Sequence, residues 1–165
     1  MELSPRDSKL INAAQGYAEL GMFLEADEQL EVISPEHRHL PPILAVRLSI
    51  HSGLGRWDLA EVVAKSLVLA EPENSQWWIS LAYATRRTSS IEAAQAILMS
   101  SRDRHAGEPI IHYNLACYAC QLGDLESAKQ FLQAAFKIAP GIRAMALEDE
   151  DLTPLWESLK IELKS

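Results

Sequence analysis

Four alanines recur along the chain at a constant spacing of 34 residues: Ala26, Ala60, Ala94 and Ala128. Five residues before each alanine stands a turn residue, which is glycine in three copies and serine in the other: Gly21, Gly55, Ser89 and Gly123. Self-similarity at a fixed period of this length is typical of repeat architectures, in which each unit buries its apolar face against the next. The register therefore predicts a stack of four similar units.

The copy between Ile110 and Pro140 predicts the structure of one unit. In its second half, apolar residues recur with the spacing of a helix stripe: Ala128, Leu132, Ala135 and Phe136. Gly123 can end a first helix in the left-handed conformation, and Asp124 can cap a second one. Each unit is thus predicted to be a helical hairpin.

Projecting this pattern onto the other copies gives eight helices. They are expected at about residues 8–20, 24–34, 41–53, 57–70, 75–87, 91–103, 109–122 and 125–138. The joint between Ser34 and Pro42 contains three prolines, so we expect it to be stiff and extended rather than helical. After Pro140, a short helix opening at Thr153-Pro154 is expected to cover the last hairpin with its apolar side: Leu155, Trp156, Leu159 and Leu163.

The 165-residue length suits one domain, and the net charge of −8 disfavours nucleic acid and anionic membrane surfaces as partners. The first residues lack the basic start and apolar run of a secretory signal, and no apolar run is long enough to cross a bilayer. Two cysteines do not form a disulfide framework. These features predict a cytoplasmic protein.

The pattern resembles the tetratricopeptide repeat, a 34-residue helix-turn-helix unit. The best-formed copy matches it at Leu115, Ala116, Gly123, Ala128, Leu132, Ala135 and Pro140. The resemblance implies an all-α fold, a right-handed α-α superhelix, with repeats at about 7–40, 41–74, 75–108 and 109–142 and a cap at 143–165, within a single domain 1–165. The chain departs from the pattern at the aromatic position of the first helix, which is taken by His51, Thr85 and Ala119, and Arg47 replaces a leucine.

In this family the first helix of each pair faces the concave side and reads a partner segment. Carried over to this chain, that geometry predicts a partner-binding groove formed by Asn12, Gln15, Ser49, Tyr83, Arg86, Arg87, Tyr113 and Asn114. The resemblance thus implies a non-catalytic adaptor or scaffold that binds another protein or peptide segment and needs no cofactor. We expect a monomer or a weak homo-oligomer.

A subclass of the family binds carboxylate tails through lysine and asparagine at early groove positions. This chain has Ile11, Gln15 and Val46 there, so that clamp is absent. Arg86 and Arg87, beside Tyr83 and Tyr113, form a cationic patch that could hold an acidic or aromatic side chain or a terminal carboxylate. Alternatively, the two arginines only complement the dipole at the end of their helix.

Three other clusters have a structural interpretation that we prefer. Cys117 and Cys120 form a C-x-x-C in the middle of a helix, where we expect them to be small packing residues rather than a redox or zinc pair. His37 and His39 are expected in a solvated loop, and the acidic run Glu148–Asp151 in a solvated linker.

Alternative functions remain open. One bacterial class of chaperones for secreted substrates is built from these repeats, so a small chaperone that holds a secreted or aggregation-prone partner is the main alternative. An enzyme or metal protein centred on Cys117 and Cys120 is a second, and self-association through an open end of the stack or through Trp77 is a third. No phosphate loop, nucleophile elbow or metalloprotease motif occurs, so we expect no enzyme activity.

Overall fold

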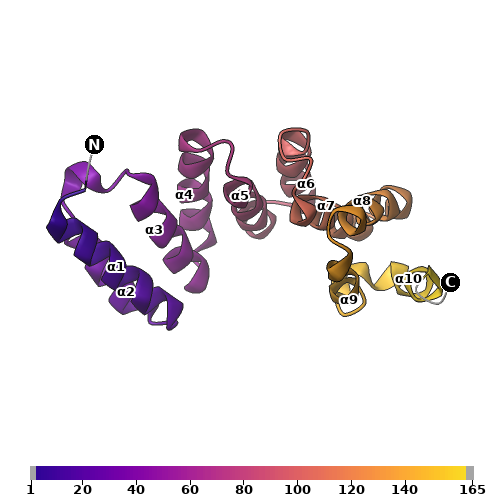
Figure 1. The fold of residues 1–165 in the computed structure, drawn as a ribbon, viewed down its shortest axis with the longest axis horizontal. Coiled ribbons are helices and arrows are strands. Elements are labelled where there is room, and N and C mark those ends of the chain that lie inside the picture. Colours follow the sequence, from indigo (N-terminus) through magenta and orange to yellow (C-terminus); the bar gives the residue numbers. More distant parts are fainter. Residues whose placement is uncertain (1–2, 163–165) are drawn as a thin grey trace. The chain divides into compact units, whose positions relative to one another are not determined.

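The computed structural model describes residues 3–162, with side chains up to Leu159, and every regular element in that range is helical. The chain divides into two compact units, Met1–Thr88 and Ser89–Ser165 (Figure 1). The all-α repeat fold that the 34-residue register predicts is thereby confirmed within each unit. The division falls in the turn of the third copy.

The first unit contains two helical hairpins and one further helix. Its elements are α1 (Pro5–Glu19), α2 (Phe23–Glu31), the 3-10 helix η1 (Pro35–His37), α3 (Pro41–Gly53), α4 (Trp57–Ala70) and α5 (Ser75–Thr88). Helices α1 and α2 lie side by side, as do α3 and α4 (Figure 1). Both α1 and α2 also contact α3, and α4 contacts α5. Each hairpin therefore packs against the next element, as in other repeat proteins.

The second unit is built around the pair α7 and α8. Its elements are α6 (Ile91–Ser101), α7 (Pro109–Gln121), α8 (Leu125–Ile138), η2 (Pro140–Ile142), α9 (Arg143–Ala146), η3 (Glu150–Leu155) and α10 (Trp156–Glu162). Helix α6 packs against α7 on one side, and η3 contacts both α7 and α8.

The four alanines of the register are fully buried, which explains their spacing: Ala26, Ala60, Ala94 and Ala128. Small side chains at these positions let neighbouring helices approach closely. Leu30, Leu67, Leu98 and Leu132 follow each of them on the same helix face and are also buried. These alanines and leucines are therefore repeated core positions of the second helices α2, α4, α6 and α8.

The turn glycines have the left-handed backbone that the hairpin pattern predicts. Gly21, Gly55 and Gly123 have φ angles of +74°, +67° and +82°. The third turn is different because Ser90, with an extended backbone, caps α6 by accepting a hydrogen bond from the amide of Ala93 at 3.1 Å. Among the described residues no residue other than glycine has a positive φ, so Ser89 does not imitate the glycine turn.

The observed helix limits follow local signals. Helix α1 begins at Pro5, three residues before the predicted start, because Ser4 caps it by accepting from the amide of Asp7. Helix α2 ends at Glu31, three residues before the predicted end. The other six helices begin and end within two residues of their predicted limits.

The joint after α2 is not the extended, solvated loop that its prolines and charges suggested. Residues Pro35–His37 form a 3-10 turn, and His37 is only 8% exposed. Its Nδ1 lies 2.5 Å from Oδ2 of Asp7, a carboxylate that is fully buried in the first turn of α1. The prediction was wrong because proline at the first helical position starts a turn as readily as it blocks a helix. The joint is thus anchored to the beginning of the chain.

Departures from the repeat pattern in α3 are accommodated by local contacts. His51 stands in an aromatic position and is buried, and burial lowers the pKa of its imidazole. Arg47 replaces a leucine and reaches outward, where its Nη1 lies 3.1 Å from a carboxylate oxygen of Glu31 on α2.

The C-terminal segment covers the last hairpin. Leu152, Leu155 and Leu159 are buried in one cluster with residues of α7 and α8, and Trp156 packs against that cluster. The indole Nε1 of Trp156 donates to the carbonyl oxygen of Ala146 at 3.1 Å. The predicted cap is therefore present, while Leu163, its last predicted apolar residue, lies outside the described part of the chain.

Candidate functional site

A cavity of about 390 Å³ opens between α1 and α3, the first helices of the first two hairpins. Its walls are formed by Ile11, Gln15, Ala18, Glu19, Pro42, Ala45, Val46 and Ser49. Ala18 and Ala45 are small, and Ile11 and Val46 are largely buried, so the floor is apolar. The volume lies at the lower end of the range of binding pockets in proteins.

Polar groups surround this floor. Gln15 and Ser49 are both exposed at the cavity wall, and the Nε2 of Gln15 donates to a carboxylate oxygen of Glu19 at 3.0 Å. An amide and a hydroxyl can both donate and accept hydrogen bonds, which suits them to main-chain groups of a bound segment. The cavity can accommodate an apolar side chain with polar contacts at its edge.

Two of the predicted groove residues, Gln15 and Ser49, therefore lie on one cavity. Asn12 is exposed on α1 but is not part of the cavity wall. The sequence pattern could place these residues on first helices, because that depends only on the register. The cavity itself depends on the sizes of side chains that meet from α1 and α3.

The aromatic and cationic residues of α5 form a second surface feature of the first unit. Tyr83 is 42% exposed, and its hydroxyl oxygen accepts a hydrogen bond of 2.6 Å from Nη2 of Arg87. The ring of Trp57, from the start of α4, meets the ring of Tyr83 edge-on with centroids 5.5 Å apart. The sequence prediction of Tyr83 and Arg87 did not include Trp57, since only the packing of α4 on α5 brings it there.

The predicted residues of the fourth copy lie in the second unit, where the chain itself covers them. Tyr113 is only 4% exposed, and its hydroxyl donates to Oδ2 of Asp149 at 2.8 Å. On the next turns of α7, Cys117 donates from Sγ to the same oxygen at 3.7 Å and Gln121 donates from Nε2 to the carbonyl oxygen of Asp151 at 3.0 Å. Asn114 is partly exposed beside them.

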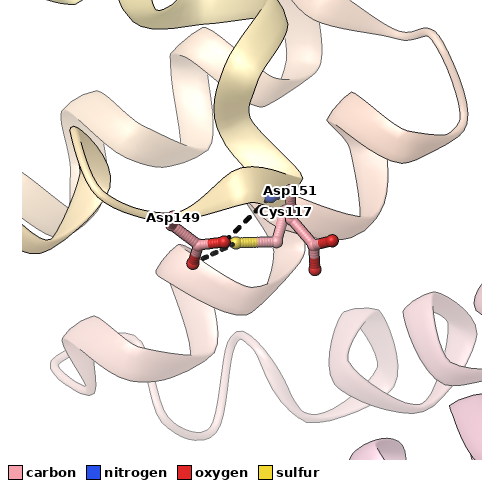
Figure 2. A group of neighbouring side chains, drawn as sticks. All are labelled: Cys117, Asp149 and Asp151. Carbon is pink, nitrogen blue, oxygen red and sulfur yellow. Dashed lines mark hydrogen bonds between the residues drawn. The ribbon is translucent and has the colours of Figure 1, made fainter.

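The acidic run is therefore not a solvated linker along its whole length. Figure 2 shows the carboxylate of Asp149 against the thiol of Cys117, with the main chain of Asp151 donating to the second oxygen of Asp149 at 3.0 Å. Glu148 and Glu150 are exposed. The prediction was wrong for Asp149 because its carboxylate serves both as the cap of η3 and as the acceptor for Tyr113.

Burial affects the acid–base properties of this cluster. The pKa of Tyr113 is raised, first because its phenol is buried and then because it donates to the Asp149 carboxylate. Burial and the neighbouring Asp151 and Asp149 also raise the pKa of the Cys120 thiol. A buried thiol with a raised pKa is a poor nucleophile, which agrees with the packing role predicted for this cysteine.

Cys117, Asp149 and Asp151 offer ligand atoms that lie within 4.8 Å of one another (Figure 2). A thiolate with two carboxylates is a donor set that zinc can accept. Both oxygens of Asp149 already accept hydrogen bonds, from Tyr113 and from the main chain of Asp151. Hydrogen bonding within the protein is thus sufficient to account for the arrangement.

Comparison with known proteins identifies the fold. No protein-family model and no curated protein sequence matches the chain. Among solved structures, MamA from Desulfovibrio magneticus RS-1, residues 41 to the end, superposes with a TM-score of 0.73 at 15% identity, covering 82% of this chain and 76% of that one. A MamA RS-1 ArsTM double mutant gives the same values, and MamA MSR-1 C2 gives a TM-score of 0.68 at 18% identity over 79% and 75%.

MamA is a tetratricopeptide-repeat protein, so the similarity confirms the predicted repeat fold. At this level of identity the likeness is one of fold. Over residues 3–162, no helix combines the length and the apolar character that a membrane span needs.

Proposed function

We propose that the chain is a non-catalytic interaction module that binds a segment of a partner protein on its first helices. The cavity between α1 and α3 carries this proposal, because it combines an apolar floor with the exposed polar groups of Gln15 and Ser49. An apolar side chain of the partner would fill the cavity, and Gln15 and Ser49 would bind its main chain.

The other predicted groove residues belong to the proposal in different ways. Asn12 extends the exposed surface of α1, and Tyr83 and Arg87 extend that of α5, where Arg86 is half-buried. Asn114 is a further candidate on α7, whereas a partner would reach Tyr113 only after Asp149 had moved away. The first unit is therefore the part of the chain that we expect to dominate partner binding.

A cavity-filling substitution tests this proposal. A photo-crosslinking amino acid at position 12, which is exposed on α1 and lies outside the cavity wall, captures the partner from the native host. Ser49→Trp fills the cavity and is expected to lower capture about tenfold or more. Ser66→Trp is the matched control, because Ser66 is an exposed serine on α4 whose hydroxyl donates only within its own helix.

Equal capture by both tryptophan variants would show that the cavity does not bind the partner. Helix content and thermal unfolding of both variants are measured alongside, since Ser49 and Ser66 are exposed and neither substitution is expected to disturb the core.

A further inference from the structure

The side chains of Trp57, Tyr83 and Arg87 form a compact cluster on the surface of the first unit. The guanidinium carbon of Arg87 lies 5.0 Å from the ring centroid of Trp57 and 4.8 Å from that of Tyr83. Arg87 also donates to the hydroxyl of Tyr83. Contacts with two rings and one hydroxyl hold the guanidinium in place before any ligand arrives, which reduces the entropy lost on binding.

The guanidinium of Arg87 has no anionic partner among the residues that the structure describes. Glu61 lies one turn after Trp57 on α4, but its carboxylate accepts from Lys65 and from the hydroxyl of Thr88. The positive charge of Arg87 is therefore available to a negatively charged ligand.

The unused polar groups of the cluster are all hydrogen-bond donors. The oxygen of Tyr83 accepts from Arg87, so its own O–H remains to donate. The indole Nε1 of Trp57 has no acceptor within the described chain, and Arg87 retains further N–H groups. Three side chains thus offer donors and a positive charge to one ligand, which must supply acceptors and a negative charge.

The two helix ends at the cluster contribute opposite fields. Trp57 is the first residue of α4, at the positive end of that helix, whereas Arg87 lies in the last turn of α5, at the negative end. Because these two contributions oppose each other, the charge of the Arg87 guanidinium decides that the electrostatic potential of the site is positive.

We propose that Trp57, Tyr83 and Arg87 form a carboxylate-binding site for an acidic side chain of a partner polypeptide. This inference rests on the proposed function of the chain as a protein-binding module. One guanidinium matches the charge of one carboxylate, which it can bind with charge-assisted hydrogen bonds. A nucleic acid backbone fits less well, since the rest of this acidic chain would repel its many phosphates.

The test is a titration of the ¹⁵N-labelled full chain with hexaglutamate, with hexaglutamine as the neutral control peptide. The indole N–H signal of Trp57, assigned with a Trp57→Phe variant, is expected to shift with hexaglutamate only. Arg87→Gln is expected to weaken hexaglutamate binding about tenfold, and Tyr83→Phe, which keeps the ring but loses the O–H donor, about threefold.

Arg102→Gln is the matched control. Arg102 is the C-terminal cap residue of α6, and Arg87 likewise lies in the last turn of α5. Both substitutions remove one positive charge. If Arg87 only complemented the end of its helix, Arg87→Gln would bind hexaglutamate as well as Arg102→Gln does, and the proposal would be overturned. An unshifted Trp57 indole signal would overturn it too.

Displacement of hexaglutamate by a short oligothymidylate at low concentration would overturn the choice of a polypeptide carboxylate in favour of a phosphate ligand. The two proposals fail separately, since the hexaglutamate titration needs no partner and the Ser49→Trp capture needs no acidic peptide.

Discussion

The buried pair of Asp7 and His37 joins the first turn of α1 to the joint that follows α2. The Asp7 carboxylate accepts from His37 and, through its other oxygen, from the main-chain amide of Ser34 at 3.4 Å. These hydrogen bonds, with that from His37 first, hold the pKa of Asp7 below its ordinary value of 3.8 despite the opposing effect of burial. A single carboxylate therefore ties 30 residues of chain into a closed loop.

This pair predicts a pH dependence of stability. Because the pKa of Asp7 is lowered by folding, its contribution to stability is present above its ordinary pKa of 3.8 and is lost as the pH falls through the folded-state value. We expect Asp7→Asn to lower the urea midpoint at neutral pH and to lose stability less steeply than the unaltered chain in this acidic range. Urea unfolding at a series of pH values measures both effects.

Asp58→Asn is the control for the Asp7 prediction, since Asp58 is an exposed aspartate in the first turn of α4. If both variants had the same urea midpoint and the same pH profile as the unaltered chain, the buried carboxylate would have no stabilising role.

The glycines of the first hairpin show how one residue type has opposite roles within an element and at its end. Gly16 lies inside α1, and a Cβ added there meets nothing within 4 Å. Gly21 lies in the turn and has a φ of +74°, a conformation in which a side chain is strained. Alanine is therefore favoured at position 16, inside the helix, and glycine is favoured at position 21, in the turn.

Two single substitutions test this contrast. Gly16→Ala is expected to stabilise the chain by about 0.4–1 kcal/mol, because alanine loses less backbone freedom on folding. Gly21→Ala is expected to destabilise it by about 1–2 kcal/mol, the cost of the left-handed conformation. Urea unfolding of both variants measures the change in the free energy of unfolding. A change of the same sign in both variants would contradict the turn geometry.

On the scale of the whole molecule, the chain consists of two compact units, each with its own buried clusters. In repeat proteins each element contacts mainly its neighbours, so a local change in packing has mainly local effects. The cap of the second unit depends on Leu152, which is fully buried against α7 and α8.

Leu152→Ala is expected to destabilise the second unit by about 2–5 kcal/mol, the usual cost of a cavity at a buried leucine. Hydrogen exchange followed by mass spectrometry should show lost protection in α7 and α8 and unchanged protection in α1, α2 and α3. Leu69→Ala, at a leucine of α4 that is 84% exposed, is the control and should leave both units unchanged. Equal loss of protection in α1 and α7 would mean that the two units unfold together.

The amino-acid sequence by itself determined the repeat, most of the helix limits and the three glycine turns. These features are local, since a helix stripe, a capping serine or a left-handed glycine acts within a few residues. The same local reasoning placed Gln15, Ser49, Tyr83 and Arg87 on first helices and predicted that Cys120 is a packing residue.

Only the tertiary structure decided which of these residues meet. In the folded chain His37 contacts Asp7, and Trp57 contacts Tyr83 and Arg87. Asp149 contacts Tyr113, which lies 36 residues earlier in the chain. Such contacts depend on the sizes and angles of packed helices rather than on any local preference. For this reason the register predicted the framework, whereas the cavity, the donor cluster and the covered face of α7 arise from the packing of elements that are distant in sequence.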